Sequence, residues 1–275
     1  MIAVLVACLL VMNLAACGGS TTAGDNKVTQ ENNAPAGTAN EDYFEWRGDY
    51  ICGLTAKGAK QTKLVIPARC VGFMNSIFLD TENKVEEITF ESDADVALNG
   101  VFTCADKLRK IELPSGLTQI GMMEFSACTS LVEITIPASV TEIGDMAFQR
   151  STALETVVFE GDVTYIGYSA FDSCKALKNI VLPDSITEIS GSAFNGCESL
   201  TEINLPKSLS VLNEFVFLNS GVVCVRVPAE LEFTHVDLSA FGRVEGTIDV
   251  YVVEGSWADL NFDDIFVDCC IKLYQ

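Results

Sequence analysis

A repeat with a period of 23 residues limits this chain to a repetitive architecture. Phenylalanine recurs through most of the sequence, in five steps of 23 residues and one of 24, at Phe102, Phe125, Phe148, Phe171, Phe194, Phe217 and Phe241. Columns of leucine, of isoleucine or valine, and of proline keep the same register, as Leu131, Ile134 and Pro137 do in one unit. Periods of about 20 to 50 residues are typical of solenoids, in which each repeat buries its apolar side against its neighbours.

The unit at residues 131–153 indicates how one coil is built. Residues 132–136 alternate between polar and apolar side chains, which predicts a short strand with one apolar face. Pro137 ends that strand because it has no N–H to donate. A second extended piece, residues 140–143, then reaches Gly144, where the missing Cβ permits a sharp bend. We expect the alanine-phenylalanine pair that follows to lie in a short helical or 3₁₀ turn on the opposite side.

Stacking such coils at about 4.8 Å per strand would pair the strands in parallel and merge the apolar columns into one core. The repeat degrades at both ends, as a solenoid requires, because a terminal coil has a neighbour on one side only. Tyr43, Phe44, Trp46 and Tyr50 are expected to close the N-terminal edge. Residues 246–253 predict a last strand. The C-terminal cap is expected to contain Trp257, Leu260, Phe262, Ile265 and Phe266.

The repeated I-x-L-P strand and I-G-x-x-A-F-x-x-C turn resemble those of the BspA-like bacterial leucine-rich repeats. The resemblance covers roughly residues 50 to 252. It implies a leucine-rich-repeat solenoid of the β-rich α/β class, with short parallel strands in a sheet and 3₁₀ or short helical turns opposite. Members of this family are typically surface-exposed proteins that attach to host proteins, cells or other microbes, so the resemblance implies binding of a surface protein or glycan.

The N-terminal segment predicts export. Residues 1–16 are uncharged and mostly apolar, too short for a membrane span of about 20 residues but suited to a signal-peptide core. They end in Leu-Ala-Ala before Cys17, which resembles the lipobox of bacterial lipoproteins, although no Lys or Arg follows Met1. The resemblance implies a lipid on Cys17 and an extracytoplasmic protein anchored to the bacterial membrane. Residues 17–42 would form a flexible tether and residues 43–275 the solenoid with its caps.

Charge excludes one class of partner. The sequence has 38 acidic and 17 basic side chains and a formal net charge of -21. Such a charge repels phosphate backbones, so we expect no nucleic-acid partner. We also expect the chain to be a monomer.

The cysteines predict a structural role. Cys128, Cys174 and Cys197 each lie three residues after a repeat phenylalanine, in a column that also holds Ser151 and Ser220. This pattern favours small buried thiols over disulfides, although neighbouring coils would place Cys174 and Cys197 within bonding reach. We expect no metal site, no cofactor and no catalytic residues, because the chain has no C-x-x-C pair and a single histidine, His235.

The outward positions of the first strand are the candidate binding residues, because a solenoid presents one side chain per coil in straight rows. They are polar at the edges with a valine pair at the centre, as Lys110, Glu112, Glu133, Thr135, Thr156, Val158, Asn179, Val181, Glu202 and Asn204. This composition suits a protein-binding patch with an apolar middle and suits ordinary strand-face packing equally well. A second row, of hydroxyl side chains, is expected to be structural, at Thr118, Thr141, Thr164, Thr187 and Ser210.

Three functions follow in order of preference. The first is a cell-surface adhesion or interaction module that binds a host or microbial protein or glycan. The second is an envelope scaffold that binds a partner on its own cell. The third is an enzyme with a site in residues 68–84, where the repeat is irregular.

Overall fold

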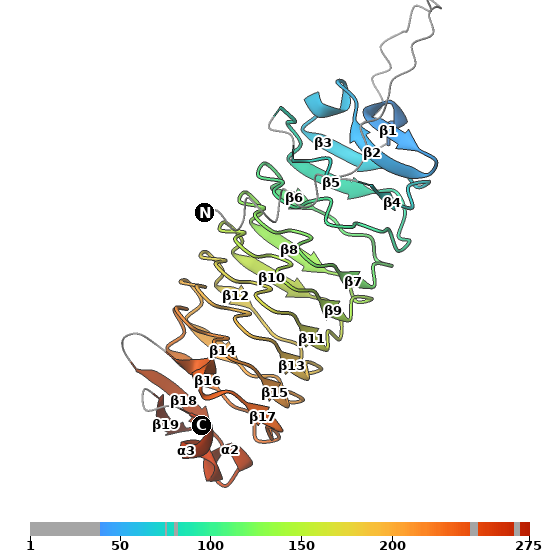
Figure 1. Ribbon diagram of the computed structural model, residues 1–275. Coiled ribbons are helices and arrows are strands. Elements are labelled where there is room, and N and C mark those ends of the chain that lie inside the picture. The colour runs from blue at the N-terminus through green and yellow to red at the C-terminus, as the bar shows by residue number, and fades with distance from the viewer. Residues whose placement is uncertain (1–38, 75, 80–81, 243–246, 267–269) are drawn as a thin grey trace, which may run out of the picture. The chain divides into compact units, whose positions relative to one another are not determined.

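The chain folds into a β-solenoid of stacked parallel strands (Figure 1). The computed structural model describes residues 39–74, 76–79, 82–242, 247–266 and 270–275, and all of them belong to one compact unit, Pro35–Gln275. The predicted signal segment, Cys17 and nearly all of the tether lie outside the described residues. The six coils between residues 110 and 236 carry two short strands each, as the repeat predicts, whereas the coil before them has one strand, at residues 87–90, and an isolated bridge at Ala97.

The first strand of each coil takes part in one of three sheets. Their order is β3-β5-β6, then β12-β10-β8, then β14-β16-β18-β19. The bounds are β3 (Lys63–Ile66), β5 (Glu87–Phe90), β6 (Lys110–Ile111), β8 (Glu133–Ile136), β10 (Thr156–Phe159), β12 (Asn179–Ile180), β14 (Glu202–Asn204), β16 (Cys224–Arg226), β18 (Ile248–Val252) and β19 (Cys270–Tyr274). Register advances by one repeat, so Val157 pairs with both Ile134 and Ile180.

The second strands form a more continuous ladder. Six of them make one parallel sheet, namely β7 (Gln119–Ile120), β9 (Glu142–Ile143), β11 (Tyr165–Ile166), β13 (Glu188–Ile189), β15 (Val211–Leu212) and β17 (His235–Val236). The hydroxyl row extends this ladder, because Thr164, Thr187 and Ser210 each donate to a backbone carbonyl of the preceding coil. These contacts support the structural role predicted for that row.

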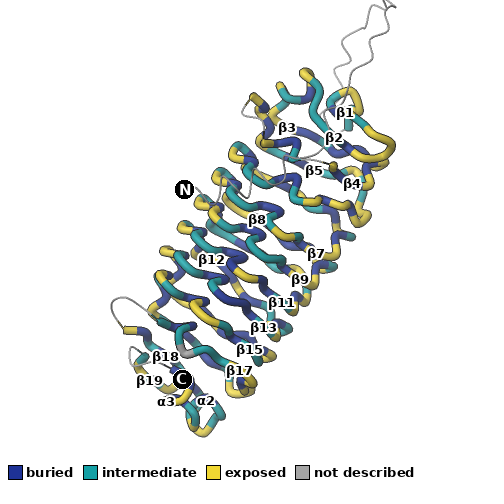
Figure 2. The backbone as a smooth tube through the Cα atoms, viewed as in Figure 1, coloured by how far each residue is buried: buried dark blue, intermediate teal, exposed yellow. Residues whose placement is uncertain are grey.

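The repeat phenylalanines form the centre of the core. From Phe102 to Phe241 each ring stacks on the next, with centroids 5.1 to 5.7 Å apart. All seven side chains are buried, and burial follows the inner wall of every coil (Figure 2). Leu131, Ile134 and Ile143 are buried beside them, which confirms the inward positions that the repeat predicts.

The turn that carries each phenylalanine differs from the predicted helical turn. In the unit of Phe148, the N–H groups of Ala147, Gln149 and Ser151 donate to carbonyls three residues back. Met146 and Arg150, at φ 56° and 61°, interrupt any helix. Their N–H groups and that of Phe148 donate to the next coil instead. Consecutive turns with bonds between coils therefore replace the helix, and of the described phenylalanine turns only the last is a 3₁₀ helix, η3 (Leu238–Phe241).

The sulfur column also binds the coils together. Cys128, Cys174 and Cys197 are fully buried free thiols. Each lies three residues after a repeat phenylalanine and donates its S–H to the carbonyl of the phenylalanine one coil earlier, at 3.1 to 3.2 Å. Ser151 makes the same contact with its hydroxyl. The prediction of structural thiols is confirmed for these three cysteines.

Both ends carry caps. The N-terminal cap consists of η1 (Glu41–Tyr43), β1 (Phe44–Arg47), β2 (Tyr50–Leu54), η2 (Gly58–Lys60) and β4 (Gly72–Phe73). The C-terminal cap contains α2 (Trp257–Leu260) and α3 (Phe262–Ile265). One prediction for the caps is wrong, because Leu260 is 77% exposed. Within the described part of the chain, no helix is long and apolar enough to cross a bilayer.

Candidate functional site

The ten predicted binding residues all lie on the outer side of the first strands or directly beside them. Eight are exposed, and Thr135 and Thr156 are half-buried. Their inward neighbours, such as Ile134, Val157 and Ile180, belong to the core. The alternation of the strands therefore presents this row to solvent, as the sequence predicts.

The sheet breaks divide these residues into three groups. Glu133, Thr135, Thr156, Val158 and Asn179 lie on the paired strands β8, β10 and β12. Val181 follows β12, Lys110 lies on β6 with Glu112 after it, and Glu202 and Asn204 lie on β14. β6 belongs to the sheet of β3 and β5, and β14 to the sheet of β16, so the described strands make no single sheet of this face.

An exposed apolar pair stands at the centre of the row. Val158 is 42% exposed and Val181 is 78% exposed. The two residues are in register on adjacent coils, because Val157 pairs with Ile180 directly before them. Asn179 and Thr156 are hydrogen-bonded beside the pair, at 3.3 Å. Apolar side chains inside a polar border are the arrangement found in many protein interfaces.

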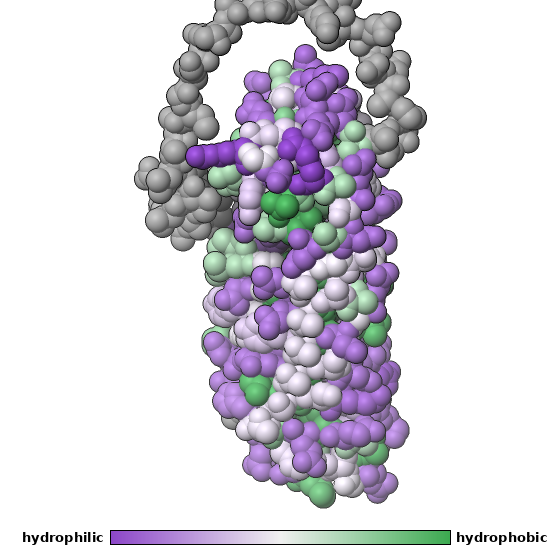
Figure 3. Space-filling model, turned by 90° about the vertical axis from the view of Figure 1, so that its right-hand side faces the viewer, coloured by the Kyte–Doolittle hydropathy of each residue, from purple (hydrophilic) through white to green (hydrophobic). Residues whose placement is uncertain are grey.

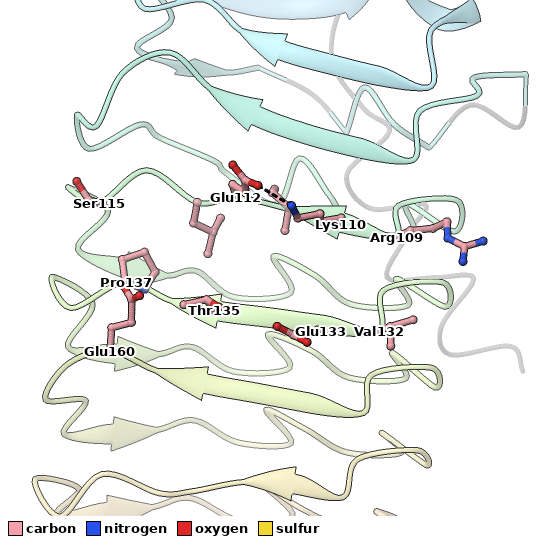
Figure 4. A pocket seen from close by; sticks show the side chains of 11 residues that line it. Arg109, Lys110, Glu112, Ser115, Val132, Glu133, Thr135, Pro137 and Glu160 are labelled. Atoms are coloured by element: carbon pink, nitrogen blue, oxygen red, sulfur yellow. Dashed lines mark hydrogen bonds and ion pairs between the residues drawn. The ribbon is translucent and has the colours of Figure 1, made fainter. Parts of the chain in front are cut away.

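A depression of about 600 Å³ opens at the break between β6 and β8 (Figure 4). Four of the predicted residues line it, namely Lys110, Glu112, Glu133 and Thr135. It is also lined by Pro137, which follows β8, and by three residues that the sequence did not single out, Arg109, Val132 and Glu160. The repeat pattern contains no signal for these, because it shows the strands but not where their pairing stops.

Charges of both signs border the depression. Lys110 Nζ lies 2.6 Å from Glu112 Oε1, as Figure 4 shows on the β6 side. The hydrogen bond with Glu112 raises the pKa of Lys110, with further contributions from the charges of Glu112, Glu87 and Glu133. Farther along the row, Arg226 Nε pairs with Glu202 Oε1 at 2.8 Å and its guanidinium lies over the ring of Tyr251. Such a face can pair with polar and charged groups around its apolar centre.

The groups that could serve a metal site or a catalytic site are considered next to this face. No group of three or more His, Cys, Asp and Glu side chains in the described ranges could hold a metal ion. The irregular segment at residues 68–84 contributes Cys70, Phe73 and Phe78 to the core, while residues 75, 80 and 81 are not described. His235 is exposed on β17, in the other sheet.

The repeat matches a known protein family. The model described as "BspA type Leucine rich repeat region" matches with six copies, over residues 56–178 and 164–254. No curated protein matches the chain.

Solved structures share the fold. A leucine-rich repeat protein from Bacteroides ovatus is 23% identical, with a TM-score of 0.54 over 75% of this chain and 61% of that one. The chain therefore spans less than two thirds of that protein. A leucine-rich repeat protein of T. pallidum is 25% identical, with a TM-score of 0.49 over 69% of this chain and 84% of that one. Repeat solenoids of this type are typically interaction modules and not enzymes.

Proposed function

Because the chain belongs to the BspA-type leucine-rich repeat family, we propose that it is an interaction module of the bacterial cell surface whose first-strand face binds a protein or glycan. The observation that carries the proposal is the exposed pair Val158 and Val181, set in a polar row and flanked by the depression at β6 and β8. Solvent-exposed valines on adjacent coils gain free energy when a partner covers them.

The proposal includes a lipid anchor. Cys17 follows a short apolar segment and precedes a polar stretch that suits a tether. An anchored chain would hold the solenoid outside the membrane, within reach of other surfaces. Replacing Cys17 by Ala is expected to move the protein from the membrane fraction to the soluble fraction. Retention in the membrane would overturn the anchor without affecting the binding face.

A binding screen tests the interaction. The full chain is applied to arrays of host matrix proteins and of bacterial and host glycans, and each ligand bound by it is retested with Val181→Asp. The substitution places a charge at the most exposed valine and should weaken binding by at least about tenfold, because a buried unpaired charge is costly. Leu260→Asp on α2, in the C-terminal cap, is the matched control, because that apolar side chain is 77% exposed, and it should leave binding unchanged.

The outcome separates the candidate functions. Ligands of host or foreign origin that lose affinity with Val181→Asp support adhesion through this face. Co-purification of a partner from the membranes of the producing cell, with no binding on the arrays, supports an envelope scaffold instead. Absence of any ligand in both experiments contradicts the proposed function.

A further inference from the structure

A buried glutamate interrupts the repeat in the turn of its second phenylalanine, Phe125. Most units place alanine before the phenylalanine, as Ala147, Ala170 and Ala193 do, but the unit of Phe125 has Glu124. Its side chain is buried like those alanines, with 1% exposure. A carboxyl group therefore occupies a position that holds a methyl group in most units.

The carboxyl group is incompletely paired. Its Oε2 accepts a hydrogen bond from the N–H of Gly100 at 2.9 Å. Oε1 is buried and has no hydrogen-bond partner among the described residues. Burial raises the pKa of Glu124 to about 7, and the backbone N–H groups of Gly100, Phe102 and Val101 only partly oppose this rise. A further hydrogen-bond donor would satisfy Oε1 and stabilise the carboxylate.

Glu124 lies in the wall of a depression of about 370 Å³. The depression opens where the second-strand ladder stops, because Ala97 bridges to Gly72 of β4 while β7 begins a separate sheet. Asp95 and Gln119 give the wall polar groups, and Val71 and Met122 give it apolar ones, at 47% and 63% exposure. Figure 3 looks onto this side of the solenoid and shows a compact hydrophobic area among hydrophilic residues in its upper part.

The composition of the wall selects the ligand. Asp95 and Glu124 disfavour an anion, as does the net charge of -21. A bare metal ion needs several more oxygen ligands than two carboxylates provide, and the volume suits a small organic group. The apolar side chains of Val71 and Met122 suit a hydrocarbon stem, and the buried carboxylate suits a cationic donor at its end.

We propose that this depression binds a primary ammonium group carried on an apolar stem, with the Glu124 carboxylate as its counter-ion. Because Oε1 is enclosed, the ammonium group can reach it only if residues of the wall move apart. This site is separate from the first-strand face and does not depend on the function proposed for that face.

Calorimetric titration of the full chain with n-butylammonium and n-butanol tests the site, because the two probes share a stem and differ in charge. At about pH 8, where Glu124 is ionised, the ammonium probe should bind at least about tenfold more tightly than the alcohol. Glu124→Gln should remove that difference. Glu124→Ala should do the same, and it is expected to fold because alanine occupies this position in the three units that follow.

Glu142→Gln is the matched control, because it removes one carboxylate from an exposed position on β9. It should bind n-butylammonium as the unmodified chain does. Two further probes distinguish the lysine side chain of a partner from a free amine. They are Nα-acetyl-lysine methylamide, which keeps its side-chain ammonium group, and 1,4-diaminobutane. The probe that binds more tightly identifies which kind of ligand the depression takes. Equal binding of n-butylammonium by the unmodified chain and by folded Glu124→Gln, or no binding by the unmodified chain, would overturn the site.

Discussion

At the scale of single residues, the repeat phenylalanine is the side chain that each coil shares with both neighbours. The ring of Phe171 stacks on Phe148 at 5.1 Å and on Phe194 at 5.2 Å, with interplanar angles of 4° and 3°. Offset stacking of this kind adds to the free energy gained from burial. One residue therefore links three coils, and its loss should destabilise the neighbouring coils as well as its own.

Phe171→Ala should lower the free energy of unfolding by about 3 to 5 kcal/mol, because it leaves a cavity in a column that cannot close around it. Phe215→Ala is the control, since that ring is 45% exposed and contributes less to the core. Urea denaturation followed by circular dichroism compares the two variants. Equal losses would mean that the ring column does not carry the stability assigned to it.

The buried thiols should resist alkylation in the folded chain. Burial raises the pKa values of Cys128, Cys174 and Cys197 well above that of a free thiol, so few thiolates form. Iodoacetamide should label these three only after unfolding, and should label the half-buried Cys224 faster in the native state. Mass spectrometry of the labelled peptides gives the site of each reaction. Rapid native labelling of Cys174 would contradict the column of enclosed thiols.

Glu124 should make stability fall as pH rises. The folded chain holds this proton up to a pKa of about 7, whereas an unperturbed carboxyl releases it near 4.5. Between these values the folded state binds more protons, so the free energy of unfolding decreases with pH, by about 3 kcal/mol in total. Glu124→Gln should remove this decrease while Glu142→Gln retains it, as measured by urea denaturation at about pH 5 and pH 8. An unchanged pH profile in Glu124→Gln would contradict this assignment.

At the scale of elements, the positions where the sequence departs from the repeat change how neighbouring coils pair. Glu160 stands where other units have Pro137 and Pro183. Its N–H donates to the carbonyl of Ile136, which extends the pairing of β10 with β8 by one residue. The chain then runs so close to the preceding coil that a Cβ on Gly161 would lie 2.3 Å from the carbonyl oxygen of Ala138.

Gly161→Ala should therefore destabilise the chain by about 1 to 3 kcal/mol, because backbone atoms cannot move aside as a flexible side chain can. Asp184→Ala is the matched control at the corresponding position of the next unit. That side chain is exposed and pairs with Lys207, so its loss should lower the unfolding temperature much less than Gly161→Ala does. Thermal unfolding measures both variants. A neutral effect of Gly161→Ala would show that the two coils are not held at this spacing.

The sequence predicts elements better than it predicts how they join. Alternation along residues 132–136 predicts β8 because inward and outward side chains differ in polarity on a half-buried strand. The left-handed residues Met146 and Arg150 escape prediction, since neither side chain marks that conformation as glycine would. The sequence also does not predict that pairing stops between β6 and β8, because pairing depends on how two coils pack against each other. For the same reason it does not predict that Arg109, Val132 and Glu160 line the depression.

At the scale of the whole solenoid, each coil has only two neighbours, so surface rows and core columns both run along the stack. The first-strand rows therefore form an extended face on which several coils can contact one large partner, while the second-strand ladder on β7 to β17 is bound together by its hydroxyl row. The excess of acidic side chains favours partners without a phosphate backbone. The central proposal is that the first-strand face binds a macromolecular ligand.

Photo-crosslinking tests that claim most directly. A benzoylphenylalanine placed at Val181 reports contacts of the first-strand face, and one placed at Glu142 reports contacts of the second-strand face. Each chain is irradiated with the ligand found in the binding screen, and the product is measured by gel electrophoresis and mass spectrometry. Binding through the first-strand face predicts a crosslink from position 181 and none from position 142. A crosslink from position 142 alone would contradict it.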